Sequence, residues 1–116
     1  MNTVIAELSG TISPPALINL GPVDRIPPGE GREYELGEEL IAVFRTRDGE
    51  VFGAQARCPH RNGHLADGII GGGLVVCPLH SFRFELATGN PAGNECPALR
   101  TYRVTINENR EILLWL

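Results

Sequence analysis

Two short motifs, each joining one cysteine to one histidine, constrain this chain more than any other feature. The first is Cys58-Pro59-His60, and the second, sixteen residues further along, is Cys77-Pro78-Leu79-His80. The proline after each cysteine holds that cysteine in extended backbone and removes one amide donor, which favours a tight, fixed loop. Two such loops that face each other would present two thiolates and two imidazoles to a single metal site.

Zinc is the obvious alternative for such a donor set, but structural zinc sites usually place both cysteines on one loop and both histidines on another element. Here each loop is mixed. Mixed loops suit a [2Fe-2S] cluster in which both cysteines bind one iron and both histidines bind the other. The pattern therefore favours an iron-sulfur cluster on four ligands and leaves a zinc-stabilised binding module as the alternative of another class. The four ligands are Cys58, His60, Cys77 and His80.

Short strands are expected on both sides of the motifs. Fourteen glycines and nine prolines in 116 residues indicate many turns, and no segment keeps a helical hydrophobic period. Strands are expected at 32–36, 40–44, 51–54, 101–106 and 112–116, with a hairpin turn at Asp48-Gly49 and with Trp115 in the core, and residues 16–20 form a short apolar run. The length suits one domain, 1–116, and the pattern predicts an all-β sandwich or barrel.

Charge and cysteine content exclude several classes of protein. The net charge is −4 and lysine and arginine form no run, which argues against nucleic-acid binding and predicts a partner with a basic docking face. An odd count of three cysteines argues against a disulfide framework and for reduced thiols. No signal peptide or membrane-spanning stretch is evident, so we expect a soluble, cytoplasmic protein without a membrane partner.

The residues around both motifs resemble a Rieske domain. The resemblance rests on the run from Cys58 to Gly68, on Cys77-Pro78-Leu79-His80, and on Phe82 to Gly89. It extends over nearly the whole chain, and it implies a Rieske-type β-sandwich with a small cluster-binding subdomain at about 56–92. Within the family, the chain most resembles the small subunit of NAD(P)H-dependent nitrite reductase, and more loosely the ferredoxins of ring-hydroxylating dioxygenases. The first of these likenesses runs through residues 45–49, 58–61 and 100–102.

This resemblance implies a one-electron carrier in nitrate assimilation. Such a subunit has no catalytic residues and no substrate site of its own, and its partner is a large subunit with flavin and sirohaem that reduces nitrite to ammonia. The alternative is a stand-alone ferredoxin that receives electrons from a flavoprotein reductase and delivers them to an aromatic-ring-hydroxylating oxygenase.

The resemblance also bears on the reduction potential. Two neutral imidazoles in place of thiolates make a cluster easier to reduce, and Rieske potentials span roughly −150 to +300 mV. High-potential members carry a disulfide between the two ligand loops and a serine two positions after the second histidine. Gly63, Leu79 and Phe82 occupy those positions here. We therefore predict a potential at the lower end of the range.

Four further features lie close to the motifs. We expect His64 to be a solvent-exposed loop histidine outside the ligand set, and Cys96 to be a semi-buried structural thiol. Ser81 stands where similar small subunits usually have glycine. The glycines of 68–73 are predicted to form turns, because the segment lacks the order and the following helix of a phosphate loop.

Overall fold

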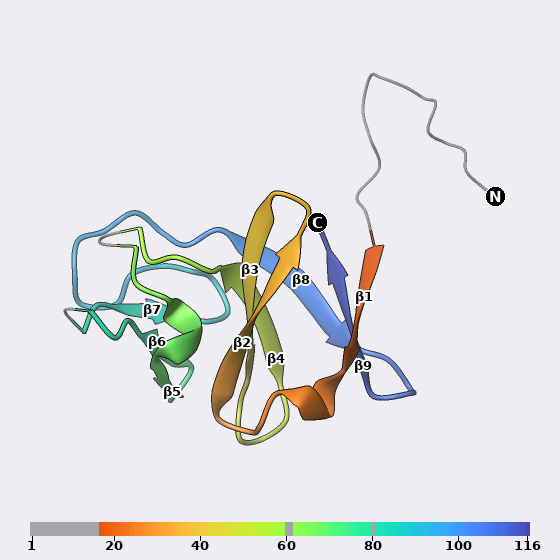
Figure 1. Ribbon diagram of the computed structural model, residues 1–116. Coiled ribbons are helices and arrows are strands. Elements are labelled where there is room, and N and C mark those ends of the chain that lie inside the picture. The colour runs from red at the N-terminus through yellow and green to blue at the C-terminus, as the bar shows by residue number, and fades with distance from the viewer. Residues whose placement is uncertain (1–16, 60–61, 80) are drawn as a thin grey trace.

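A computed structural model describes residues 17–59, 62–79 and 81–116 of the chain (Figure 1). These ranges contain nine strands and two short 3-10 helices. The strands are β1 (Leu17–Pro22), β2 (Glu30–Leu36), β3 (Glu39–Arg45), β4 (Val51–Gln55), β5 (Ile69–Gly71), β6 (Leu74–Val76), β7 (Arg83–Glu85), β8 (Thr101–Ile106) and β9 (Glu111–Trp115). The helices are η2 (Val23–Arg25) and η3 (Leu65–Asp67). The predicted all-β Rieske-type fold is confirmed, and each expected strand is present.

The larger sheet has six strands in the order β1-β9-β8-β4-β3-β2. Its two halves meet at β4 and β8, which pair only at Gly53 with Tyr102 and at Ala54 with Thr101. A Cβ at Gly53 would lie 2.6 Å from a methyl group of Val104, so the absence of a side chain permits this close approach. The sheet curls at this point (Figure 1), and its apolar faces enclose what we call the base core. The base core consists of Leu20, Val23, Ile26, Ile41, Val43, Ile112 and Leu114.

Strand β3 is buried on both of its faces and so connects the base to the rest of the molecule. Ile41 and Val43 point into the base core, whereas Ala42 and Phe44 point to the opposite side, because side chains alternate along a strand. That side packs on a second cluster, here called the site core. The site core consists of Ala42, Phe44, Ala54, Ala56, Cys58, Leu65, Ile70, Val75, Cys77, Phe84, Leu86 and Leu99. Both motif cysteines therefore lie in the same apolar core as Ala42 and Phe44 of β3.

The smaller sheet has the order β5-β6-β7 and lies beside the larger one (Figure 1). Gly71, one of the glycines predicted to form turns, lies in its first strand, so that prediction is wrong for Gly71. Ile70 is drawn into the site core and pairs with Val75, which makes a strand of three residues despite the flanking glycines. The prediction holds for Gly72 and Gly73, whose φ angles of +59° and +80° form the β5–β6 turn.

The last strand differs from its prediction in one respect. Ile112 and Leu114 are buried as expected, but Trp115 points to the other face and is only half-buried. The guanidinium of Arg103 lies 4.6 Å from the centre of the Trp115 ring, so this ring forms a surface cation–π contact rather than core packing. Among the helices of the described ranges, none has the length and apolar character needed to cross a membrane.

Candidate metal centre

The two motifs lie in loops that close in the same way. The first loop joins β4 to η3, and the second joins β6 to β7. The amide of Cys58 donates to the carbonyl of Gly63 at 2.8 Å, and the amide of Cys77 donates to the carbonyl of Phe82 at 2.7 Å. Each bond spans five residues from the cysteine, so each loop returns the chain to the place where it left. The two loops are therefore closed by equivalent hydrogen bonds, and the second loop repeats the structure of the first.

The repeat extends to the backbone conformation before each closing carbonyl. Asn62 has a φ of +60° and Ser81 a φ of +57°, both in the left-handed region. This region disfavours most side chains and favours glycine. The conformation accounts for the glycine that similar small subunits usually have at the position of Ser81. No hydrogen bond of the Ser81 hydroxyl occurs within the described part of the chain.

The thiols of Cys58 and Cys77 are buried and lie close together. Their residues are 0% and 1% exposed, and the Cys58 thiol is near enough to influence the pKa of the Cys77 thiol. Burial raises the pKa of the Cys77 thiol, and the neighbouring Cys58 raises it further, against a backbone hydrogen bond from Leu79 that lowers it. Two soft donors held side by side in an apolar core match the cysteine-bound iron of a Rieske cluster.

The absence of a side chain at Gly63 lets the two loops approach. A Cβ at this position would lie 2.9 Å from the Cys77 sulfur and 3.2 Å from Leu79. Gly63 and Leu79 thus touch across the loops, at the positions that hold a disulfide in high-potential Rieske proteins. All three cysteines are free thiols, so packing rather than a covalent bond joins the loops here.

Of the four predicted ligands, Cys58 and Cys77 are brought together by the fold. His60 and His80 lie outside the described residues, as does Arg61. Their assignment as ligands therefore rests on the sequence motifs and stays a prediction.

His64 has a partner that the sequence did not reveal. Its Nδ1 lies 2.5 Å from the Oε2 of Glu33 on β2, and the two side chains are 43% and 26% exposed. The expected solvent-exposed histidine is therefore a half-buried one, tied to the base sheet. Beside this contact, a Cβ at Gly31 would lie 3.2 Å from the backbone of Ala66, so β2 and η3 pack closely. The pair fastens the first ligand loop to β2.

We expect the His64→Ala variant to keep its cluster and to lose some stability. His64 lies outside the predicted ligand set, and a half-exposed hydrogen bond between two side chains contributes about 1 kcal/mol to the free energy of unfolding. Chemical denaturation and the EPR spectrum of the reduced protein measure the two effects. Glu33→Gln should match His64→Ala, whereas Glu35→Gln on the same strand, where Glu35 is exposed, should match the wild type. Loss of the cluster in His64→Ala would contradict this assignment.

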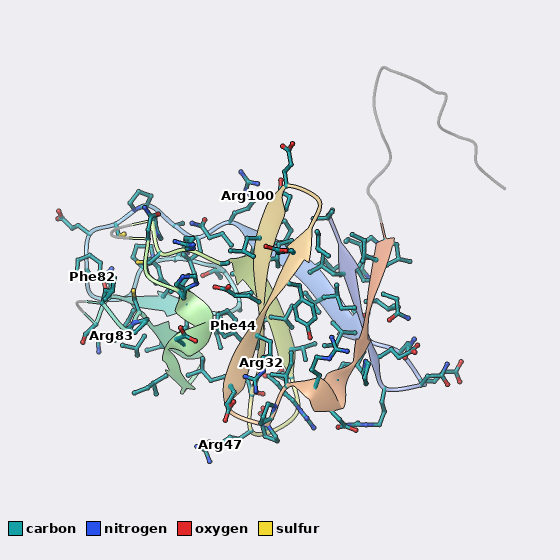
Figure 2. All side chains as sticks on the ribbon, viewed as in Figure 1. Arg32, Phe44, Arg47, Phe82, Arg83 and Arg100 are labelled. Atoms are coloured by element: carbon teal, nitrogen blue, oxygen red, sulfur yellow. The ribbon has the colours of Figure 1, made fainter. Side chains whose placement is uncertain are left out.

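Cys96 is half-buried, as the sequence predicts, and packs against the site core. Burial raises the pKa of its thiol, and the proximity of Cys58 raises it further. Phe82 also packs partly against the site core, and its place at the outer end of the small sheet is visible in Figure 2. Both residues therefore line the surroundings of the two buried thiols.

Comparison with known proteins agrees with this geometry. Residues 16–103 match the family model described as Rieske [2Fe-2S] domain. The chain is 34% identical over 94 residues to the biphenyl dioxygenase ferredoxin subunit of Pseudomonas sp. (strain KKS102), which covers 79% of this chain and 84% of that protein.

Two solved structures share the fold. The "putative NADH-dependent nitrite reductase small subunit from Mycobacterium tuberculosis" superposes with a TM-score of 0.81 at 22% identity, over 90% of this chain and 97% of that one. The ferredoxin of carbazole 1,9a-dioxygenase from Nocardioides aromaticivorans IC177 superposes with a TM-score of 0.76 at 28% identity, over 88% and 97%.

Proposed function

The chain belongs to the Rieske [2Fe-2S] domain family, and on that premise we propose that it is the electron-transfer small subunit of an NAD(P)H-dependent nitrite reductase. The family establishes the coarser part of this statement, a ferredoxin-like electron carrier with a Rieske-type [2Fe-2S] cluster. The proposal adds the partner and the ligand set. The ligands are Cys58, His60, Cys77 and His80.

The ligand proposal rests on two neighbouring buried thiols. Each thiol lies in a loop that the cysteine amide closes through a hydrogen bond to a carbonyl five residues later. Cys58 and Cys77 supply the two thiolates that one iron requires. Each loop then places a histidine within three residues of its cysteine. When bound, the cluster accepts and releases one electron. The site core shields the cysteine side from water, since Phe44, Leu65 and Phe84 are fully buried there.

The proposed partner is a large nitrite reductase subunit in the cytoplasm. Support comes from the likeness of residues 45–49, 58–61 and 100–102 to such small subunits, and from a fold and length shared with the Mycobacterium tuberculosis protein. On this proposal, residues 1–116 act as one domain whose cluster-binding subdomain is at about 56–92. The subunit has no substrate site, and nitrite is reduced on the partner.

A second candidate is a ferredoxin that serves a ring-hydroxylating dioxygenase together with a flavoprotein reductase. The identities of 34% and 28% to dioxygenase ferredoxins favour it. The two candidates share the cluster and differ only in the partner. A zinc-stabilised module, the alternative of another class, has no support from the family.

The first test is an EPR spectrum of the dithionite-reduced protein, with iron, sulfide and zinc quantified on the same sample. We expect a rhombic signal of low average g and a ratio of about two irons and two sulfides per chain. One zinc per chain without a signal would overturn the cluster. To identify the partner, the tagged protein is purified from its own cells. A co-purifying sirohaem spectrum supports nitrite reductase, and a flavoprotein reductase with an oxygenase supports the second candidate.

A further inference from the structure

The first ligand loop contains a dipeptide with a chemistry of its own. Among the asparagines of the sequence, only Asn62 is followed by a glycine. The backbone nitrogen after an asparagine can attack the carbon of the side-chain amide and close a five-membered ring, and a side chain on the following residue hinders this approach. Gly63 has no side chain, so it leaves the path between the two atoms open. Both residues lie in the described part of the loop.

Hydrogen bonds hold the backbone on each side of the nitrogen that would attack, but they do not hold that nitrogen. The amide of Asn62 donates to the carbonyl of Cys58 at 2.8 Å, and the carbonyl of Gly63 accepts from the amide of Cys58 at 2.8 Å. The carbonyl of Asn62 accepts from the guanidinium of Arg57 at 3.3 Å. Among the residues that the structure describes, the amide of Gly63 has no acceptor. The nucleophile of the ring closure therefore has no competing hydrogen bond there.

The side chain of Asn62 also differs from those of the other described asparagines. Asn19, Asn94 and Asn107 each use the side-chain oxygen to accept a backbone amide, at distances of 2.8 to 2.9 Å. Asn90 precedes a proline, whose nitrogen carries no proton. Asn62 is exposed, and its side chain makes no hydrogen bond with any residue of the described ranges. The carbon that would be attacked is therefore not held away from Gly63.

We propose that Asn62 is a site of spontaneous deamidation in the first ligand loop. The nitrogen of Gly63 bonds to the side-chain carbon of Asn62, and the side-chain nitrogen leaves as ammonia together with the amide proton of Gly63. Water then opens the resulting succinimide and restores an N–H group. Cleavage at the former side-chain carbon gives aspartate, and cleavage at the backbone carbonyl carbon gives isoaspartate. No electrons are transferred, and water is the co-reactant.

The two products change the loop in different ways. Each adds a carboxylate, which is ionised at neutral pH. Isoaspartate also adds one carbon atom to the backbone between Cys58 and Gly63. That part of the loop is closed by the Cys58 amide, and Gly63 is buried, with a Cβ there lying 2.9 Å from the Cys77 sulfur. We therefore expect isoaspartate to weaken cluster binding, and aspartate to leave the cluster bound. This consequence rests on the proposed function, because it requires a cluster on this loop.

The experiment follows each asparagine of the holoprotein separately. The protein is incubated in a mildly alkaline buffer made with water enriched in heavy oxygen, and samples are digested and mapped by mass spectrometry. Fragmentation by electron transfer distinguishes aspartate from isoaspartate. We expect both products at Asn62, each with an oxygen atom from the labelled water. Asn109 is the internal control, because it is also exposed but precedes Arg110. It should convert at least about tenfold more slowly, since the bulky neighbour hinders the reacting geometry.

Two variants connect the modification to the cluster. Asn62→Gly removes the reacting amide and suits the observed φ of +60°, so it should keep its iron throughout the incubation. Freshly purified Asn62→Asp carries the added charge without the longer backbone and should show the wild-type iron content. In the wild type, we expect the loss of iron to rise with the fraction of isoaspartate.

Three outcomes would count against these statements, and each concerns a different one. Unmodified Asn62 at the end of the incubation, or equal conversion of Asn62 and Asn109, would overturn the deamidation site. Equal loss of iron from the wild type and from Asn62→Gly would overturn its effect on the cluster. A freshly purified wild type without the Rieske EPR signal would overturn the proposed function, whereas the mass measurement at Asn62 would still test the site.

Discussion

Replacing Cys58 or Cys77 with alanine is expected to abolish the Rieske EPR signal and to remove nearly all bound iron. Each substitution deletes one of the two thiolates proposed to hold a single iron, and both thiols lie fully buried in the site core. The measurement is the EPR spectrum of the reduced variant, with iron and sulfide quantified. Far-ultraviolet circular dichroism shows whether the β fold persists.

Cys96 provides the matched control for these variants. It is the third cysteine and is half-buried against the same site core, where the nearby Cys58 raises the pKa of its thiol. Cys96→Ala should retain the signal and the iron content of the wild type. Loss of iron there would place Cys96 in the donor set, and a native signal in Cys77→Ala would refute the proposed ligands.

The same experiment extends to the two histidines. His60→Ala and His80→Ala are each expected to lose the Rieske signal, because imidazole ligation of one iron gives this cluster its low average g and its raised potential. These residues lie outside the described parts of the chain, so the spectrum is the direct evidence for their role. A native signal in either variant would refute the assignment of that histidine.

The strands and the motif cysteines were predictable because local patterns encode them. Alternation of polar and apolar residues marks β2, and the apolar run of β3 reflects a strand buried on both faces. Asp48-Gly49 predicts a turn because glycine tolerates the observed φ of +97°. Each of these signals lies within a few neighbouring residues.

The contacts that shape the site were not predictable, because they join residues far apart in the chain. Glu33 and His64 are 31 positions apart, and neither residue type marks the pairing in the sequence. The glycines around Ile70 disfavour a strand, but the burial of Ile70 in the site core stabilises β5. The sequence thus predicts the strands and the two buried cysteines, whereas the contacts around them follow from the fold.

Gly68→Ala is expected to lower the free energy of unfolding by about 3 kcal/mol, since overpacking at a rigid backbone contact has costs of this size. A Cβ at Gly68 would lie 2.0 Å from the carbonyl oxygen of Val76 and 3.2 Å from that of Leu65. Both obstacles are backbone atoms, which cannot rotate away as a side chain can. The φ of −82° at Gly68 is open to any residue, so the effect is steric and not conformational. Denaturation in urea measures it.

The position of this clash links stability to the cluster. Val76 precedes Cys77, and Leu65 follows the first ligand loop, so relief of the clash must separate the two loops or shift β6. We therefore expect Gly68→Ala to bind less iron as well as to unfold at a lower urea concentration. Gly71→Ala is the matched control, because a Cβ there meets nothing within 4 Å and the residue lies in the same small sheet. If both variants unfolded at the same urea concentration, the close approach of Gly68 to Val76 would not be what holds the second loop in place. If only Gly68→Ala lost stability and iron, this backbone contact would be what keeps the two buried thiols together.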